Sequence, residues 1–510
     1  MGGPSSRRGT PVVTEVDAVV VGSGPNGLAA AVTLARAGLS VQVLEAQAVA
    51  GGGARTLELG LADGVVHDIC SAVHPMAVAS PFLREFDLPA RGVELLQPEV
   101  AYANPLDGGR AALAYRSLDR TASALGVDGS AWRQLLRPLV DDPDGVVAVA
   151  LGDHRRVPRQ LGTAAAFGVR LAEQGTFAWA ARFRDQEAAA LLTGVGAHAI
   201  TRLPSLSAAG TALLLASLAH AGGWPVPRGG SGAIVGALLA DVQMHGGTVV
   251  TGTRVDRAED LPPARAYLFD TSPRTAVRVL GQRLAGRVAR GLVAFPRGRG
   301  AAAKVDLVLS GPVPWAHPEV ALAGTVHLGG SRVQTAAAEA AVASGGHAER
   351  PTVLVSDPGV VDPSRVTPAG LRPFWAYAHV PAGSTLDVTE AVLAQVERFA
   401  PGFRDLVVAS RCIPAARLAE HDANLVGGDI SGGGASMYRM LARPRLAWDP
   451  YVLVPPRGGS RATGAAGAWL CSSSTPPGPG VHGLPGWYAA RRALRDGFGL
   501  PSDPSLAPWD

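Results

Sequence analysis

Residues 17–56 constrain the fold of this chain more than any other segment. The β-branched run 19–21 leads directly into the loop GSGPNG at residues 22–27. An alanine-rich helical stretch follows, and a second apolar run at 41–44 delivers Glu45. Strand, glycine turn, helix and strand in this order, with an acid about twenty positions beyond the glycines, are the fingerprint of a dinucleotide-binding βαβ unit.

The three glycines of the loop have distinct expected roles. Gly22 allows the tight turn, Gly24 lets the backbone approach a pyrophosphate, and Gly27 lets the helix pack closely on the strand. Free N–H groups at the start of the helix then attract the phosphates. The residues predicted to hold the nucleotide are Gly22, Gly24, Pro25, Asn26, Gly27 and, at the adenosine ribose, Glu45.

Length and charge narrow the classes of protein. The 510 residues suffice for two or three domain-sized units, and a hydrophobic content of 47% indicates a globular chain. The 46 basic and 42 acidic residues nearly balance, so nucleic acid is not an expected partner. Heavy use of Ala, Gly and Arg suggests a GC-rich bacterial genome.

Cysteines and apolar runs indicate the compartment. Cys70, Cys412 and Cys471 are odd in number and far apart, which argues against a disulfide framework or a zinc site. Residues 1–14 lack the apolar region of a signal peptide. No apolar stretch reaches the roughly 18 to 20 residues of a membrane span. We therefore expect a cytoplasmic protein, while its oligomeric state stays open.

The order of predicted elements indicates a discontinuous organisation. The fold class predicted is α/β, a Rossmann-like nucleotide-binding domain that carries an inserted α+β substrate domain. The predicted pieces are a disordered tail at 1–15, a nucleotide domain at 16–120, 223–290 and 416–500, and a substrate or cap domain at 121–222 and 291–415.

Three features favour flavin over nicotinamide. A second glycine cluster, 51–53, follows Glu45 closely and lets a backbone pass beneath a pyrophosphate. The segment 470–494 joins a small-residue loop to a helix that starts near Pro485, and such a helix N-terminus can face a flavin pyrimidine. A second GxGxxG with suitable spacing is missing from the sequence. We therefore expect one flavin, reduced by the organic substrate itself.

With these motifs the chain resembles the phytoene dehydrogenase-related FAD-dependent oxidoreductases, which are relatives of carotenoid desaturases and, more distantly, of amine oxidases. The resemblance extends almost end to end. Besides the nucleotide motifs it includes DICSAVHP at 68–75, WPVPRGGSGAI at 224–234, FWAYAHVPAGS at 374–384 and STPPGPGVHG at 474–483. It implies one non-covalently bound FAD in a fold of the glutathione-reductase-like flavoprotein class.

The resemblance also implies roles for single residues. Gly51, Gly52 and Arg55 would join Glu45 around the ADP half, and Val255 would touch the adenine through its backbone. In many relatives arginine follows the Gly-Gly pair directly, whereas Gly53 and Ala54 precede Arg55 here. The residues that would lie near the isoalloxazine are Gly478, Gly480, Val481, His482 and Gly483.

Two side chains are candidates for catalysis. Lys304, the one lysine of the sequence, stands between the alanine run 301–303 and the predicted strand 305–309. In amine-oxidase relatives a substrate-domain lysine holds a water near flavin N5, and the compact ammonium with its adjustable pKa suits that task. The alternative is a surface lysine at a strand end. His482 lies in the flavin-facing loop; the alternative is a histidine that bonds only to loop backbone.

Other residues leave two interpretations open. Trp375, Tyr377 and His379 alternate along one predicted strand and share a face, which lines either a substrate cavity or a core. The helical stretch 211–221 is apolar almost all round, so it is either a weak contact with a membrane surface or a buried cap helix. No pair of histidines has the spacing of metal ligands.

The function expected is that of an FAD-dependent dehydrogenase, desaturase or oxidase. A hydride would pass from a C–H bond of a largely apolar small molecule to flavin N5, and O2 or a quinone would reoxidise the flavin. The alternatives are an amine or amino-acid oxidase, a redox-neutral flavin-dependent isomerase and, from another class, a flavin-bound interaction protein without turnover.

Overall fold

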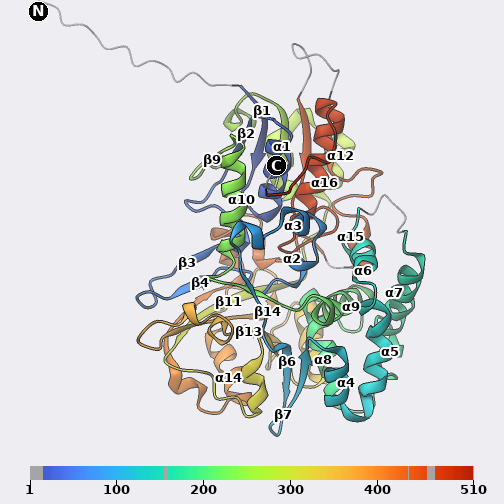
Figure 1. Ribbon diagram of the computed structural model, residues 1–510, viewed down its shortest axis with the longest axis vertical. Helices are drawn as coiled ribbons and strands as arrows, with labels where there is room; N and C mark the ends of the chain where they lie inside the picture. The colour runs from blue at the N-terminus through green and yellow to red at the C-terminus, as the bar shows by residue number, and fades with distance from the viewer. Residues whose placement is uncertain (1–14, 154–158, 435, 457–465, 509–510) are drawn as a thin grey trace, which may run out of the picture.

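Two β-sheets, one above the other along the long axis, organise the molecule (Figure 1). The computed structural model describes residues 15–153, 159–434, 436–456 and 466–508. Of the tail predicted at 1–15, all but Glu15 lies outside the described residues. Within the described part, no helix has both the length and the hydropathy needed to cross a bilayer.

The upper sheet has six strands, and all its neighbours pair in parallel except the edge strand β16. It joins chain segments that are far apart in the sequence, which places the first glycine loop at the centre of the sheet. In spatial order its strands are β16 (Val452–Val454), β17 (Gly467–Leu470), β10 (Ala264–Phe269), β1 (Val16–Val21), β2 (Val41–Leu44) and β9 (Thr248–Val250).

Alternation along β1 explains why this sheet is covered on both faces. Ala18 and Val20 belong to the large core that includes helices α1 (Pro25–Arg36), α10 (Gly232–Met244) and α16 (Leu484–Arg492). Val19 and Val21 point to the other face, into a core built with α11 (Pro273–Leu280) and α12 (Gly286–Val293). The α/β fold with a parallel Rossmann-like sheet is thus as predicted.

The lower sheet has seven strands and is mainly antiparallel. Its strands, in spatial order, are β15 (Val407–Ile413), β11 (Gly300–Leu309), β14 (Arg372–Pro381), β13 (Val353–Ser356), β12 (Val326–Leu328), β6 (Val100–Leu106) and β7 (Arg110–Tyr115). Helix α14 (Thr389–Phe399) packs on one face through Val392 and Val396. Two short ribbons complete the strands, β3 (Thr56–Glu58) with β4 (Val66–Asp68) and β5 (Leu95–Leu96) with β8 (Val226–Pro227).

The hairpin β6–β7 differs from the prediction. It lies within 16–120, the segment expected to belong wholly to the nucleotide domain, yet it joins the lower sheet. The cause is a non-local pairing, because Ala103 of β6 stands beside Val326 of β12 in parallel register. Such a partner leaves no trace in the local sequence pattern.

Helices cover the right-hand side of the lower sheet in Figure 1. Helix α9 (Leu206–Ala221) is packed inside this group, and its residues Leu213 and Leu218 are buried. Most of the apolar stretch 211–221 is therefore a buried helix. The remaining helices are α2 (Pro75–Ala79), α3 (Pro81–Phe86), α4 (Leu118–Ala124), α5 (Gly129–Val140), α6 (Pro143–Ala150), α7 (Leu161–Gln174), α8 (Gln186–Gly196), α13 (Arg332–Ala343) and α15 (Met437–Leu441).

Candidate active site

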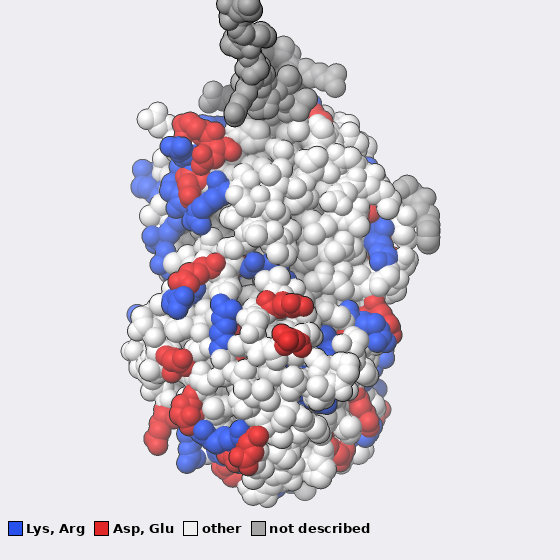
Figure 2. Space-filling model, turned by 90° about the vertical axis from the view of Figure 1, so that its left-hand side faces the viewer, with Lys and Arg blue, Asp and Glu red and all other residues white. Residues whose placement is uncertain are grey.

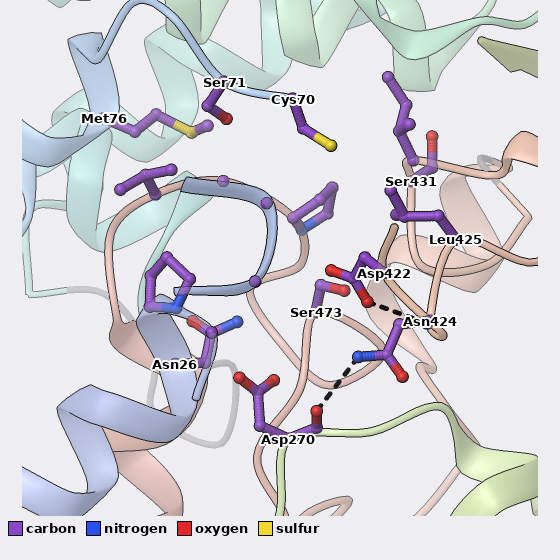
Figure 3. A pocket seen from close by; sticks show the side chains of 18 of the residues that line it. Asn26, Cys70, Ser71, Met76, Asp270, Asp422, Asn424, Leu425, Ser431 and Ser473 are labelled. Carbon is purple, nitrogen blue, oxygen red and sulfur yellow. Dashed lines mark hydrogen bonds between the residues drawn. The ribbon is translucent and has the colours of Figure 1, made fainter. Parts of the chain in front are cut away.

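A cavity of about 670 Å³ connects the first glycine loop with the lower sheet. At one end it is lined by Gly22, Gly24 and Glu45, and on the lower sheet by Lys304 and Tyr377. Helices α7 and α9 provide apolar walls between them. Figure 3 shows part of this space, with Asn26 and Asp270 on one side and Cys70 and Ser71 on the other. One cavity therefore joins the predicted nucleotide residues to the inserted sheet.

The geometry of the glycine loop explains why glycine is required there. A Cβ on Gly27 would lie 2.1 Å from the Gly22 carbonyl oxygen, so only glycine lets α1 approach β1 this closely. A Cβ on Gly52 would lie 2.9 Å from the Gly24 Cα, which brings the two glycine clusters together. Gly22 has φ of +99°, a conformation that other residues adopt only with strain.

Glu45 is held at the end of β2 by three donors. The Ser23 N–H and hydroxyl both donate to Oε2, at 2.9 and 2.5 Å, and the Gln47 N–H donates to Oε1 at 2.8 Å. A carboxylate has about four lone-pair sites, so hydrogen bonds from a ribose remain available to it. The cavity is also lined by Pro25, Asn26, Gly52 and Val255.

Asp270, which follows β10, is a site residue that the sequence analysis missed. Its Oδ2 accepts from the Gly27 N–H at 2.9 Å, so the carboxyl stands at the N-terminus of α1. Burial, with further effects from Asp422 and Glu45, raises the pKa of this carboxyl to about 8. The available signal was an acid directly after an apolar strand, 266–269. The sequence alone did not indicate that this acid reaches the glycine loop.

Asp422 is a second acid that was not predicted from the sequence, and it lines the same cavity (Figure 3). Burial raises its pKa, while the Asn424 N–H, which donates to it at 2.9 Å, and Arg55 act in the opposite direction. Asn424 also donates through Nδ2 to the Asp270 carbonyl oxygen at 3.2 Å. The nucleotide end of the cavity is thus rich in carboxyl groups.

Arg55 lies differently from the expectation that it contacts the ADP half. Its side chain is buried and does not line the cavity. Nε donates to the Gly52 carbonyl oxygen at 2.8 Å, and Nη2 donates to the His421 carbonyl oxygen. Two residues between the glycine pair and Arg55 turn the guanidinium toward backbone. Its role is therefore to fix the second glycine cluster.

The loop before α16 only partly meets the cavity. Gly480 and Val481 line the cavity, whereas Gly478 and Gly483 do not. Gly51, in the second glycine cluster, also lies outside the lining. Gly478 leaves space for Arg443, because a Cβ there would lie 2.4 Å from Arg443 Nη1. Gly483 leaves space for Ala29 and Phe82, because a Cβ there would lie 2.8 Å from Ala29 Cβ and from Phe82 Cδ1. These glycines are required for packing around the cavity wall.

His482 is displaced from the role predicted for it. The imidazole is fully buried, does not line the cavity, and accepts through Nδ1 from the Leu484 N–H at 3.2 Å. Burial lowers its pKa to about 4. The ring thus takes the alternative position, bonded to backbone at the start of α16 beside the turn at Gly483.

Lys304 stands in the middle of β11, so it is not a surface lysine at a strand end. Its alanine-rich surroundings resemble a loop in sequence, but pairing with both β14 and β15 makes them a strand. The ammonium lines the cavity, lies 5.2 Å from the centre of the Trp375 ring and donates to Asp306. Burial alone would raise the pKa of Asp306, but the Lys304 charge lowers it.

The face shared by Trp375, Tyr377 and His379 does border the cavity. The first two side chains line it, with their rings 5.1 Å apart in an edge arrangement. His379 lies behind them and pairs with the buried Glu339 at 2.5 Å. Cys70 also lines the cavity, and burial together with Asp422 raises its pKa to about 12, so the thiol stays protonated. The three cysteines are free.

Comparison with known proteins supports the fold. A family model for an NAD(P)-binding Rossmann-like domain matches residues 20–86. Uncharacterised proteins of Mycobacterium tuberculosis and Mycobacterium bovis are 26% identical, over 94% of this chain and 97% of the relative.

Solved structures with low sequence identity extend this likeness. An oxidoreductase from Methanosarcina mazei superposes with a TM-score of 0.56 at 16% identity, over 92% of this chain and 98% of that one. A putrescine oxidase bound to putrescine gives 0.54 at 16%, over 95% and 99%. Cyclohexylamine oxidase from Brevibacterium oxydans gives 0.55 at 16%, over 94% and 100%. The chain therefore shares the overall fold of these oxidases.

Proposed function

We propose that this chain is an FAD-dependent oxidoreductase that removes a hydride from a largely apolar organic molecule. The FAD is held without a covalent bond, and O2 or a quinone accepts its electrons. The observation that carries the proposal is the single cavity that joins the nucleotide loop to Lys304 and the aromatic face of the lower sheet. The resemblance to phytoene dehydrogenase-related proteins supports the same assignment.

The residues present fit a dinucleotide. The crossing of Gly24 and Gly52 leaves backbone without side chains beside the start of α1. Glu45 offers oxygen atoms to the ribose, and Asn26 has a buried Oδ1 without a partner among the described residues. Asp270 would repel a diphosphate if it were charged, but its raised pKa keeps it protonated near neutral pH. A protonated carboxyl donates a hydrogen bond instead.

Bound FAD would supply a two-electron acceptor for the hydride. The protein supplies positioning and an environment that excludes water, because apolar residues of α7 and α9 surround the part of the cavity beyond the loop. Lys304 and Asp306 hold a proton on the sheet face that borders this space. They are the groups best placed to accept or deliver the proton that accompanies hydride removal.

The first test is identification of the cofactor in the purified protein. We expect the visible absorption of oxidised flavin, with intact FAD released into the supernatant by acid precipitation. Glu45→Ala should lower FAD content, whereas Glu58→Ala, at an exposed position of β3, should leave it unchanged. A colourless protein that FAD cannot reconstitute would refute the proposal.

One observation favours a second candidate, an amino-acid oxidase. Such an enzyme needs a cation for the substrate carboxylate, and Arg443 is buried and lines the cavity. Its Nη2 donates to the Ser431 carbonyl oxygen at 2.7 Å, and burial lowers its pKa to about 10 against the opposing effect of Asp429. Reduction of the flavin by L- or D-amino acids, abolished in Arg443→Met, would favour this candidate.

A further inference from the structure

Two histidines in contact, His198 and His327, form part of the cavity wall away from the nucleotide loop. Their Nε2 atoms lie 2.9 Å apart, and only His198 lines the cavity. His327 is fully buried on β12, whereas His198 follows α8 and is partly accessible. Trp224 packs edge-on against both rings. The pair thus connects a buried strand to the surface of the cavity.

The hydrogen bond between these rings determines which proton each carries. Burial lowers the pKa of His198 to about 3 and that of His327 well below its usual value, so both rings are neutral. One Nε2 must donate and the other accept. If His198 donated, the proton of His327 would sit on Nδ1, which is buried without a partner among the described residues.

An unpaired buried donor is costly, so the opposite arrangement is the stable one. His327 Nε2–H then donates to His198 Nε2. The remaining proton of His198 is on Nδ1, which has no partner among the described residues and, unlike His327 Nδ1, is not buried. His198 therefore presents an N–H donor to the cavity.

Tyr377 supplies a second polar group on the same wall. Its register partner is Lys304 on β11, and its ring stacks on His379, 5.6 Å between centroids. In the sheet register His327 stands opposite Leu354 and Leu354 stands opposite Tyr377, so Tyr377 and the histidine that bonds to His198 lie in one row of the sheet. The Tyr377 hydroxyl has no hydrogen-bond partner among the described residues, and it is not one of the buried unpaired atoms.

The polar side chains around this wall bond to one another in pairs. Lys304 pairs with Asp306, and His379 pairs with Glu339, both within the protein. Two neutral donors in such surroundings suit a neutral oxygen better than a carboxylate, because Glu339, which bonds to the His379 ring stacked on Tyr377, opposes negative charge at Tyr377. A carbonyl oxygen has two lone pairs and can accept from both.

We propose that Tyr377 and His198 form a recognition site for the neutral carbonyl oxygen of an otherwise apolar ligand. The identification of this ligand as the substrate rests on the proposed oxidoreductase function. The binding of the ligand to this site does not depend on that function. With its oxygen on this pair, the molecule lies across the sheet face beside Lys304, because Tyr377 and Lys304 are directly opposite each other on adjacent strands.

The test compares two probes that differ by the carbonyl group, 4-phenyl-2-butanone and butylbenzene. Binding to the protein as purified is measured by equilibrium dialysis, and flavin content is measured separately, so that failure of the flavin assignment does not affect the result. We expect the ketone to bind more tightly than the hydrocarbon. Tyr377→Phe and His198→Leu should each weaken ketone binding about 5- to 10-fold, the effect of one hydrogen bond, and leave butylbenzene unchanged.

Infrared spectroscopy of the ketone labelled with ¹³C at the carbonyl gives a second readout. The reference is the C=O stretching frequency of the ketone dissolved in a hydrocarbon. Bound to the wild-type protein, the ketone should absorb at a lower frequency than this reference. Bound to Tyr377→Phe, it should absorb closer to the reference. The matched control is Thr211→Val, a cavity position on α9 whose hydroxyl donates to the Ser207 carbonyl oxygen. Equal binding of the two probes, no binding of the ketone, or equal weakening of both probes in the variants would overturn the proposal.

Discussion

Replacement of Asp270 by Asn should change how the stability of the protein depends on pH. The carboxyl is 6% exposed and accepts from the Gly27 N–H, and burial raises its pKa to about 8. The unfolded chain loses this proton near pH 4. Between pH 4 and 8 the native state therefore holds one proton more than the unfolded state, and its stability falls as the pH rises.

The size of the effect follows from the pKa difference. Each unit corresponds to about 1.4 kcal/mol, so this carboxyl destabilises the native state by roughly 5 kcal/mol above pH 8 relative to pH 4. Between pH 6 and 8 its contribution is roughly 3 kcal/mol. The amide introduced by Asp270→Asn would retain the shape and an oxygen that accepts from Gly27 but would not titrate.

Urea denaturation at pH 6, 7 and 8 measures this difference on protein freed of nucleotide. The free energy of unfolding of Asp270→Asn, minus that of the wild type, should increase by roughly 3 kcal/mol across this range. Asp256→Asn, a half-exposed carboxyl at the cavity rim, is the control and should run parallel to the wild type. If Asp270→Asn also runs parallel, the carboxyl is not held protonated, and the reasoning about the nucleotide end is wrong.

Three other changes have defined outcomes. Lys304→Met removes the ammonium partner of Asp306 and leaves this buried carboxylate beside His67, 3.6 Å away; it should cost about 3 kcal/mol of unfolding free energy. Lys304→Met with Asp306→Leu should recover most of this loss, and equal stability of the single variant would contradict the pairing. His482→Ala should cost about 1 kcal/mol, through the lost bond to the Leu484 N–H, with rates of substrate oxidation unchanged; a large loss of rate would restore His482 to the mechanism. FAD affinity of the wild type should fall as the pH rises above about 8, where Asp270 ionises, and isothermal titration should show no such fall for Asp270→Asn.

The nucleotide half was largely predictable because its signals are local. The strand at 41–44 has its predicted bounds, and the helix predicted after the first glycine loop is α1. The glycine positions follow from backbone crossings within one βαβ unit, and that unit is continuous in sequence. Periodicity and glycine spacing were therefore sufficient evidence there.

The substrate half depended on contacts that the sequence does not display. The alanines before Lys304 lack β-branching, so their strand forms only through pairing with β14 and β15. His198 has no motif, and its proton position depends on His327, which is distant in sequence. Asp270 was visible as an acid at the end of a strand, but the loss of water that shifts its pKa is a property of the assembled cavity.

Charge is arranged differently at the two ends of the cavity, and this difference has a functional consequence. The outer surface shown in Figure 2 carries interspersed basic and acidic side chains, and the two ends of the cavity differ in how their charged side chains are arranged. At the sheet end the buried ions pair with each other, as Lys304 does with Asp306. At the loop end Glu45, Asp270 and Asp422 lie together, with the guanidinium of Arg55 turned toward backbone.

The carboxyl groups at this end would repel an anionic dinucleotide if they were ionised, so a protonated Asp270 favours its binding. Its binding should therefore be coupled to protonation of Asp270. A neutral molecule can enter the sheet end without any such coupling. In the proposed enzyme, pH should therefore act on occupancy of the loop end, while neutral donors such as Tyr377 should select the organic ligand.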